Sequence, residues 1–132
     1  MACGKTVTIE ILPISCDDRG SVFEPLGAAQ LALQRNVHVV LTGPGLVRGN
    51  HYHVRGTEVL TVIGPALVRT GRGLSQADTH VPDGEVYRFS IPPEVSHAIR
   101  NTGTRPMLLV AFNTEMHDLA QPDTIRSVIL SD

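Results

Sequence analysis

"RGNHYHVRGTE", residues 48–58, places two histidines one residue apart and a glutamate five residues after the second of them. Successive side chains of a strand point to opposite faces, so His51 and His53 share one face and Tyr52, which we assign to the core, lies on the other. Two imidazoles about 7 Å apart along a strand can converge on one ion when they point into a cavity. If "RGT" forms a hairpin turn, Glu58 begins the next strand beside His53. A closed barrel would bring His97 to the same point.

Imidazole and carboxylate ligands suit divalent transition metals. We place zinc first, with iron, manganese and nickel as alternatives, because the ligand types alone do not choose among them. A histidine pair by itself is weak evidence for a metal site, and two polar residues on one strand face are the plain alternative. We assign His38, His80 and His117 to surface or packing positions.

The sequence around this stretch predicts an all-β fold. Nine prolines and twelve glycines interrupt short runs rich in valine, leucine, isoleucine and threonine, as in an antiparallel sandwich or barrel. Residues 24–35 could form a short helix, since a proline stands at a plausible first turn. Residues 123–132 could form a strand or a short helix. The expected strands are 36–41, 46–54, 58–63, 66–70, 85–91, 95–101 and 107–113.

Length and composition predict one domain, residues 1–132, because a second core would need more apolar material. The net charge of −2 gives no sign of a nucleic-acid partner. No apolar run approaches the roughly 20 residues that span a bilayer, so we expect no membrane partner and a cytoplasmic location. We expect Cys3 and Cys16 to be thiols, with Cys3 in a fraying terminus.

The spacing in this region resembles the first motif of the cupin superfamily. That motif is a glycine, five residues, HxH, a short gap, a glutamate and a later glycine. Here it reads Gly45, His51, His53, Glu58 and Gly64. The resemblance implies a double-stranded β-helix, which is a jelly-roll-like barrel.

A second cupin motif is matched at Pro92, His97 and Asn101, while Gly84 stands two residues early and Glu94 replaces the usual glycine. These departures affect the turn and leave the histidine in place. In cupins with this pattern, the residues at His51, His53, Glu58 and His97 are the metal ligands. The two motifs together cover residues 45–101.

Two stretches resemble a narrower group of cupins. "RGNHYH" (48–53) and "DDRGSVFEPL" (17–26) are similar to segments of enzymes that act on nucleotide-linked keto-sugars. These are the dTDP-4-keto-6-deoxyhexose 3,5-epimerases, the 3,4-ketoisomerases and the C-terminal cupin domain of enzymes that epimerise a capsule sugar. Glu58 resembles the metal-binding capsule type, since the ketoisomerases tend to carry glutamine there.

The resemblance implies a nucleotide-sugar substrate and enolate chemistry, in which a base removes a hydrogen next to a ketone. His51 matches the base of the 3,5-epimerases, but a metal-bound imidazole has no free lone pair for a proton. If a metal is present, Tyr87 or a metal-bound hydroxide becomes the candidate base. Arg48 and Arg19 are the candidates to bind the substrate; the alternative for Arg48 is a solvated arginine at the end of a strand, and the alternative for Arg19 is a structural role. We expect Asn101 to hydrogen-bond backbone groups in a turn.

Three functions remain open at this stage. The first is an epimerase or isomerase of a nucleotide-linked 4-keto-6-deoxy sugar. The second is a metal-dependent dioxygenase, a polyketide cyclase or another small-molecule enzyme, which the same ligand set would serve. The third is a ligand-binding cupin without catalysis. Small barrels have exposed edges to cover, so we also expect a homodimer.

Overall fold

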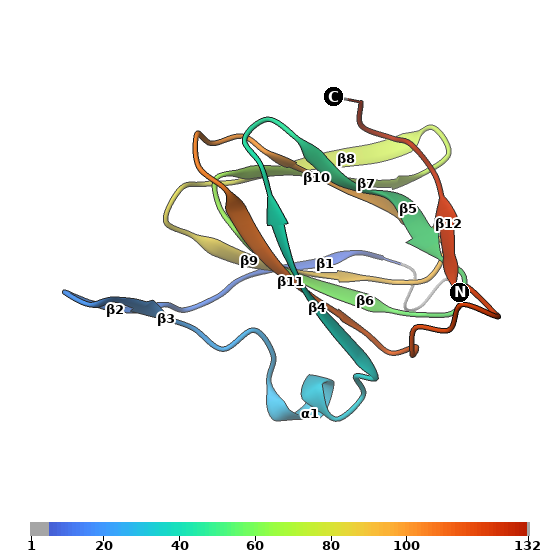
Figure 1. The fold of residues 1–132 in the computed structure, drawn as a ribbon, viewed down its shortest axis with the longest axis horizontal. Coiled ribbons are helices and arrows are strands. Elements are labelled where there is room, and N and C mark those ends of the chain that lie inside the picture. The colour runs from blue at the N-terminus through green and yellow to red at the C-terminus, as the bar shows by residue number, and fades with distance from the viewer. Residues whose placement is uncertain (1–5, 132) are drawn as a thin grey trace.

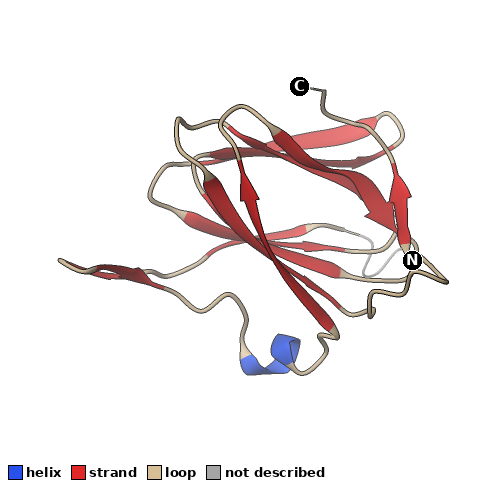
Figure 2. Ribbon diagram, viewed as in Figure 1, coloured by secondary structure: helices blue, strands red, loops and turns tan. Residues whose placement is uncertain are grey.

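The fold consists of two five-stranded antiparallel sheets that face each other, with a two-stranded ribbon projecting to one side (Figures 1 and 2). The computed structural model describes residues 6–131. Four residues form the one helix of this part of the chain, α1 (Ala28–Leu31). The strands are β1 (Thr8–Ile11), β2 (Ser15–Asp17), β3 (Gly20–Val22), β4 (Asn36–Thr42), β5 (Val47–His53), β6 (Glu58–Ile63), β7 (Ala66–Arg72), β8 (Ser75–Val81), β9 (Val86–Ile91), β10 (Ser96–Asn101), β11 (Met107–Asn113) and β12 (Thr124–Arg126).

One sheet has the order β1-β9-β6-β11-β4, and the other has the order β12-β5-β10-β7-β8. Consecutive strands therefore mostly alternate between the sheets, as in a jelly roll. This arrangement corrects one expectation. "RGT" (55–57) is not a hairpin turn, because β5 and β6 belong to different sheets. Glu58 consequently faces the histidines of β5 across the interior of the barrel.

The apolar core lies between the two sheets. Along β6, Leu60 and Val62 follow Glu58 on the same face, and both are buried. Phe89 and Ile91 of the paired strand β9 complete this layer. Full burial of an aliphatic or aromatic side chain of this size contributes about 1.5–3 kcal/mol relative to exposure. The core therefore fixes β6 in place, and Glu58 is held at the start of this strand.

The predicted all-β class is confirmed, and all seven expected strands are present within one or two residues at each end. The C-terminal segment forms a strand, β12, on the edge of β5. Of the helix predicted within residues 24–35, only the four residues of α1 are helical. Four strands were not predicted from the sequence: β1, β2 and β3 are short and mostly exposed, and β8 is polar along nearly its whole length.

Two further expectations concern the membrane and the cysteines. Across residues 6–131, no helix has the length and apolar character needed to cross a membrane. Cys16 is exposed and carries a free thiol. Cys3 lies outside the described residues.

Candidate functional site

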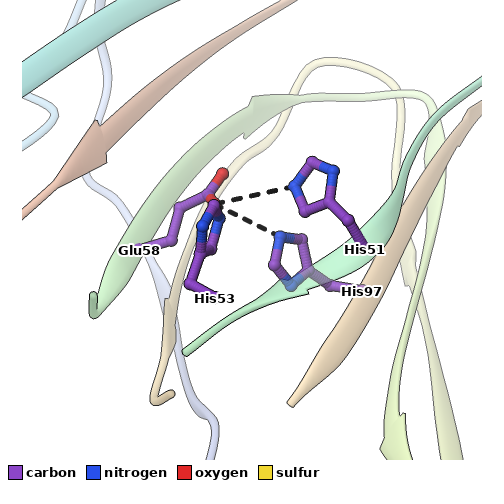
Figure 3. A group of neighbouring side chains, drawn as sticks. All are labelled: His51, His53, Glu58 and His97. Atoms are coloured by element: carbon purple, nitrogen blue, oxygen red, sulfur yellow. Dashed lines mark hydrogen bonds and ion pairs between the residues drawn. The ribbon is translucent and has the colours of Figure 1, made fainter. Parts of the chain in front are cut away.

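The four residues of the expected ligand set meet at one point of the barrel interior (Figure 3). His51 and His97 are direct partners in the register of β5 and β10, and their ring centroids lie 4.7 Å apart. His53 follows on β5, and Glu58 reaches the same point from the opposite sheet. One ligand atom of each residue lies within 4.8 Å of all the others. The two sheets thus bring together residues that are up to 46 positions apart in the chain.

The local sequence before His51 explains how the strand aims its side chain. Gly49 and Asn50 both have positive φ angles, of 91° and 57°, which glycine adopts freely and asparagine more readily than most residues. A Cβ atom on Gly49 would stand 2.7 Å from the backbone oxygen of His97. The register of β5 and β10 shifts at this point, between His97 and Ala98. The "GN" dipeptide therefore allows the two strands to approach each other beside the site.

The electrostatics of the site centre on the Glu58 carboxylate. Its Oε2 atom contacts Nε2 of His53 and lies 3.3 Å from Nε2 of His97 and 3.9 Å from Nε2 of His51. Burial alone would raise the pKa of Glu58, but the three imidazoles outweigh burial and hold this pKa well below its usual range. Burial would likewise lower the pKa of His97, yet the adjacent Glu58 carboxylate raises it. The cluster therefore favours a carboxylate anion with positive charge beside it.

The donor atoms fit a metal ion. The Nδ1–H group of His97 donates to the Val95 carbonyl oxygen at 3.0 Å, so that in the neutral imidazole Nε2 carries the free lone pair. This Nε2 atom is buried and has no well-aligned hydrogen-bond partner. Nδ1 of His53 lies 3.2 Å from the Thr124 hydroxyl, so its outward nitrogen is also engaged. Outer partners of this kind orient imidazole ligands in metal sites, and the cluster can hold a divalent transition metal.

The cluster opens into a cavity of about 420 Å³ between the sheets, which is within the usual size range of small-molecule sites. His53, Glu58 and His97 are buried, while His51 is half-buried and faces the cavity. The other lining residues come from β4, β5, β6, β10, β11, β12 and the segment between β11 and β12; they are Asn36, His38, Val40, Val47, Arg48, Gly49, Leu60, Ile99, Leu109, Ala111, Phe112, Asn113, Glu115, Met116, His117, Asp118, Asp123 and Thr124.

The structure brings Arg48 to this cavity but not the other residues proposed to act beside the cluster. Tyr87 packs against the core next to Phe89 and does not line the cavity. Its register partner on β6 is Val62, four residues beyond Glu58. Arg19 lies on the projecting β2–β3 ribbon, where its guanidinium pairs with Asp17 at 2.6 Å. Neither residue is placed to contact a molecule bound in the cavity of this chain.

Two minor expectations concern residues near the cluster. Tyr52 is half-buried and does not line the cavity, in keeping with its position on the other face of β5. Within residues 6–131, the Asn101 side chain hydrogen-bonds only to backbone groups: its amide donates to the carbonyl oxygens of Thr42 and Arg105, and its carbonyl accepts from the amide of Gly103. Asn101 therefore fastens the turn after β10, as expected.

Sequence reasoning missed several residues of the site. His38 and His117 were assigned to surface or packing positions; both side chains are exposed, and both also line the cavity, which was not predicted. Asp123 accepts hydrogen bonds from the amides of Arg55 and Gly56 and thereby fixes the segment that carries Thr124. For His38 a signal existed in the alternation of "NVHVVLT", but the inward face of this strand is the more polar one. The usual rule that apolar residues face inward would have placed His38 outside.

Known proteins resemble this chain over the segment that carries the site. A family model described as the polysaccharide biosynthesis C-terminal domain matches residues 15–125. The chain belongs to this family. The match includes the four clustered residues and the segments that line the cavity. It confirms the resemblance to the cupin domain of the capsule-sugar enzymes.

Several relatives of this polysaccharide biosynthesis domain are known. The UDP-2-acetamido-2,6-beta-L-arabino-hexul-4-ose reductase of Pseudomonas aeruginosa is 31% identical over 116 residues, which are 86% of this chain and 30% of that protein. The capsular polysaccharide assembling protein CapF of Staphylococcus aureus superposes with a TM-score of 0.67 and 28% identity, over 89% of this chain and 33% of CapF. The chain thus spans about a third of these two relatives.

A smaller protein shares the fold over nearly its whole length. The sugar 3,4-ketoisomerase QdtA of Thermoanaerobacterium thermosaccharolyticum, solved in complex with TDP, superposes with a TM-score of 0.71 at 20% identity. The alignment covers 96% of this chain and 90% of QdtA. This likeness confirms the predicted cupin-type barrel.

Proposed function

We propose that this protein is a metal-dependent epimerase or isomerase of a nucleotide-linked 4-keto-6-deoxy sugar. The observation that carries the proposal is the convergence of three imidazoles on Glu58 inside a cavity of substrate size. The relatives support it, because their names describe a reductase of a UDP-linked hexulose, a capsule assembly protein and a sugar ketoisomerase. An enzyme of this class removes and returns a hydrogen on a carbon next to a ketone.

His51, His53, Glu58 and His97 would hold the metal, with zinc placed first. When bound, such a metal supplies Lewis-acid stabilisation of negative charge on a ketone oxygen. The buried side of the cluster excludes water, and the half-buried His51 side faces the cavity, where the sugar would lie. In this arrangement His51 acts as a ligand, so the proton must pass to another residue.

Arg48 is our candidate for the diphosphate or the sugar hydroxyls. It lines the cavity from β5, three residues before His51. A guanidinium can hold two oxygens of a phosphate at once. Arg48 has no ion pair or side-chain hydrogen bond among the described residues, which leaves its donors available to a substrate.

We also propose that residues 1–132 make up one domain, that the protein forms a homodimer, and that it is cytoplasmic. Support for the dimer comes from β4, which is an edge strand of its sheet and exposes Val37, Val39 and Leu41 on its outer face. An open apolar edge is a surface that proteins usually cover. Analytical ultracentrifugation at micromolar concentration should show a dimer, and a monomer would contradict this part of the proposal.

Hydrogen exchange on the sugar tests the activity. We expect dTDP- or UDP-4-keto-6-deoxyhexoses incubated with the metal-loaded protein in D2O to exchange the hydrogen at C3 or C5, as followed by proton NMR. The matched control is the His53→Gln, Glu58→Gln double variant, which should show no exchange above the buffer rate. Failure to exchange any such substrate, or oxygen uptake by an iron-loaded protein, would refute the proposal.

A further inference from the structure

A histidine outside the four-residue cluster lines the cavity from β4, an edge strand of its sheet. On β4, Asn36, His38 and Val40 line the cavity, while Val37 and Val39 between them are exposed on the outer face. This alternation directs the imidazole of His38 inward. The side chain still has access to solvent, because His38 is exposed at the cavity mouth.

The sheet register fixes where His38 lies relative to the four clustered residues. His38 pairs with Ala111 of β11, which pairs with Leu60 of β6. Glu58 precedes Leu60 by one inward position. Two strand spacings of about 4.8 Å and two residues of about 3.4 Å therefore separate the backbones of His38 and Glu58 by about 12 Å. Between them, the sheet surface that lines the cavity carries the single methyl group of Ala111. The space above this methyl group can hold a sugar ring.

The metal-ligand role of the cluster leaves its imidazoles without a free lone pair, so the proton needs another acceptor in the same cavity. The carboxylates that line it are engaged. Glu115 lies 3.6 Å from the Arg55 guanidinium, Asp118 accepts from the amide of Ala120 at 2.9 Å, and Asp123 accepts from two backbone amides. Each of these carboxylates is thus already held by a partner within the protein.

Two histidines that line the cavity remain as candidate proton acceptors, and they lie on different kinds of backbone structure. His117 lies on the segment between β11 and β12, outside any regular element. His38 lies in the middle of β4, whose every residue is paired with β11 in a continuous register. A group on a strand is held more closely to a productive geometry than a group on a loop. Among the described residues, His38 has no ion pair or side-chain hydrogen bond that would occupy its nitrogens.

We propose that His38 is the general base that removes the hydrogen next to the ketone, a role that rests on the proposed function. The C–H bond breaks, its proton goes to the free imidazole nitrogen of His38, and its electron pair moves toward the carbonyl oxygen to form the enolate. The proton then returns to the enolate carbon and restores the ketone: return to the opposite face inverts this carbon, and return to the same face gives back the starting sugar with its hydrogen exchanged. Because His38 has access to water, its proton exchanges with solvent before the return step, and no oxidant or reductant is consumed.

The test measures hydrogen exchange on the sugar in D2O with His38→Gln. Loss of a general base lowers a rate about 10²–10⁴-fold, so we expect a decrease in this range. Metal content, UDP affinity and the melting temperature should match those of the unaltered protein. His80→Gln is the matched control, since His80 is exposed on β8 and does not line the cavity; its exchange rate should not change.

A second variant separates proton transfer from packing. In His38→Ala, added imidazole should restore part of the exchange rate, because a free base can enter the space that the side chain leaves. Normal exchange in His38→Gln, or no recovery with imidazole, would overturn the role of His38 while leaving the proposed function intact. A loss confined to His117→Gln would move the base to the segment after β11. No exchange by the unaltered protein would refute the proposed function itself.

Discussion

Replacement of Glu58 by glutamine tests the electrostatics of the cluster most sharply. The change keeps the shape of the side chain and removes the one negative charge on which three imidazoles converge. Removal of one partner from a buried charged pair costs about 3–5 kcal/mol. We expect a loss of this size in the metal-free protein at pH 6, where the raised pKa keeps His97 protonated. Metal affinity should fall by more than about 100-fold, since even outer-sphere partners of ligands contribute 10–100-fold.

The stability of the metal-free protein should depend on pH, and the two pKa shifts set the direction of this dependence. The lowered pKa of Glu58 contributes stability that is present above its ordinary value of 4.5 and is lost as the pH falls through the folded-state pKa. The raised pKa of His97 contributes stability that is complete below its ordinary value of 6.5 and is lost as the pH rises through the folded-state pKa. Metal-free protein should therefore be most stable between these two values, and Glu58→Gln should lose this dependence.

The assay is urea unfolding in the presence of a chelator at pH 6 and pH 8, together with metal titration followed by calorimetry. Glu115→Gln is the control, because it makes the same change at another carboxylate that lines the cavity. Wild-type metal affinity in Glu58→Gln, or equal stability losses in the two variants at pH 6, would refute the reasoning.

Three further predictions concern the supports of the site. Gly49→Ala should lower the free energy of unfolding by about 1–3 kcal/mol, because its φ is 91° and its Cβ would meet the His97 oxygen; urea unfolding would measure this loss, and Gly27→Ala, which meets no atom within 4 Å, should not show it. Asn50→Ala removes the side chain that binds the amides of Ile129 and Leu130, so hydrogen exchange at these two amides should accelerate while that of the β6 amides stays slow. Chelation of the metal should lower the melting temperature at pH 8, and added zinc should restore it; a melting temperature that ignores the chelator would contradict the metal assignment.

The sequence predicted the parts of the fold in which local pattern and tertiary role agree. Strands such as β6 and β9 combine β-branched residues with flanking glycine and proline, and both were expected at nearly their observed bounds. The β8 strand escaped prediction because pairing with β7, and not apolar alternation, holds it in place. The prediction of a hairpin turn after His53 was wrong for a related reason. A short polar connection looks the same whether it joins two strands of one sheet or crosses between two sheets.

The candidate site was predictable where the spacing of ligands resembles a known family, and the structure gathers all four of these residues. Its other walls were not predictable. The inward face of β4 carries Asn36 and His38, and its outward face carries valines. Polar residues face inward there because this part of the strand lines the cavity. Only the three-dimensional arrangement shows this, and it also separates Tyr87 from the cluster.

The proposed function depends on a metal held by His51, His53, Glu58 and His97 in the cavity that would bind the keto-sugar. The most direct measurement follows metal content and sugar hydrogen exchange in D2O on the same samples, through chelation and stepwise return of zinc. We expect the exchange rate to rise in proportion to occupancy and to level off at about one ion per chain. Full exchange by a protein from which elemental analysis detects no transition metal would contradict the account.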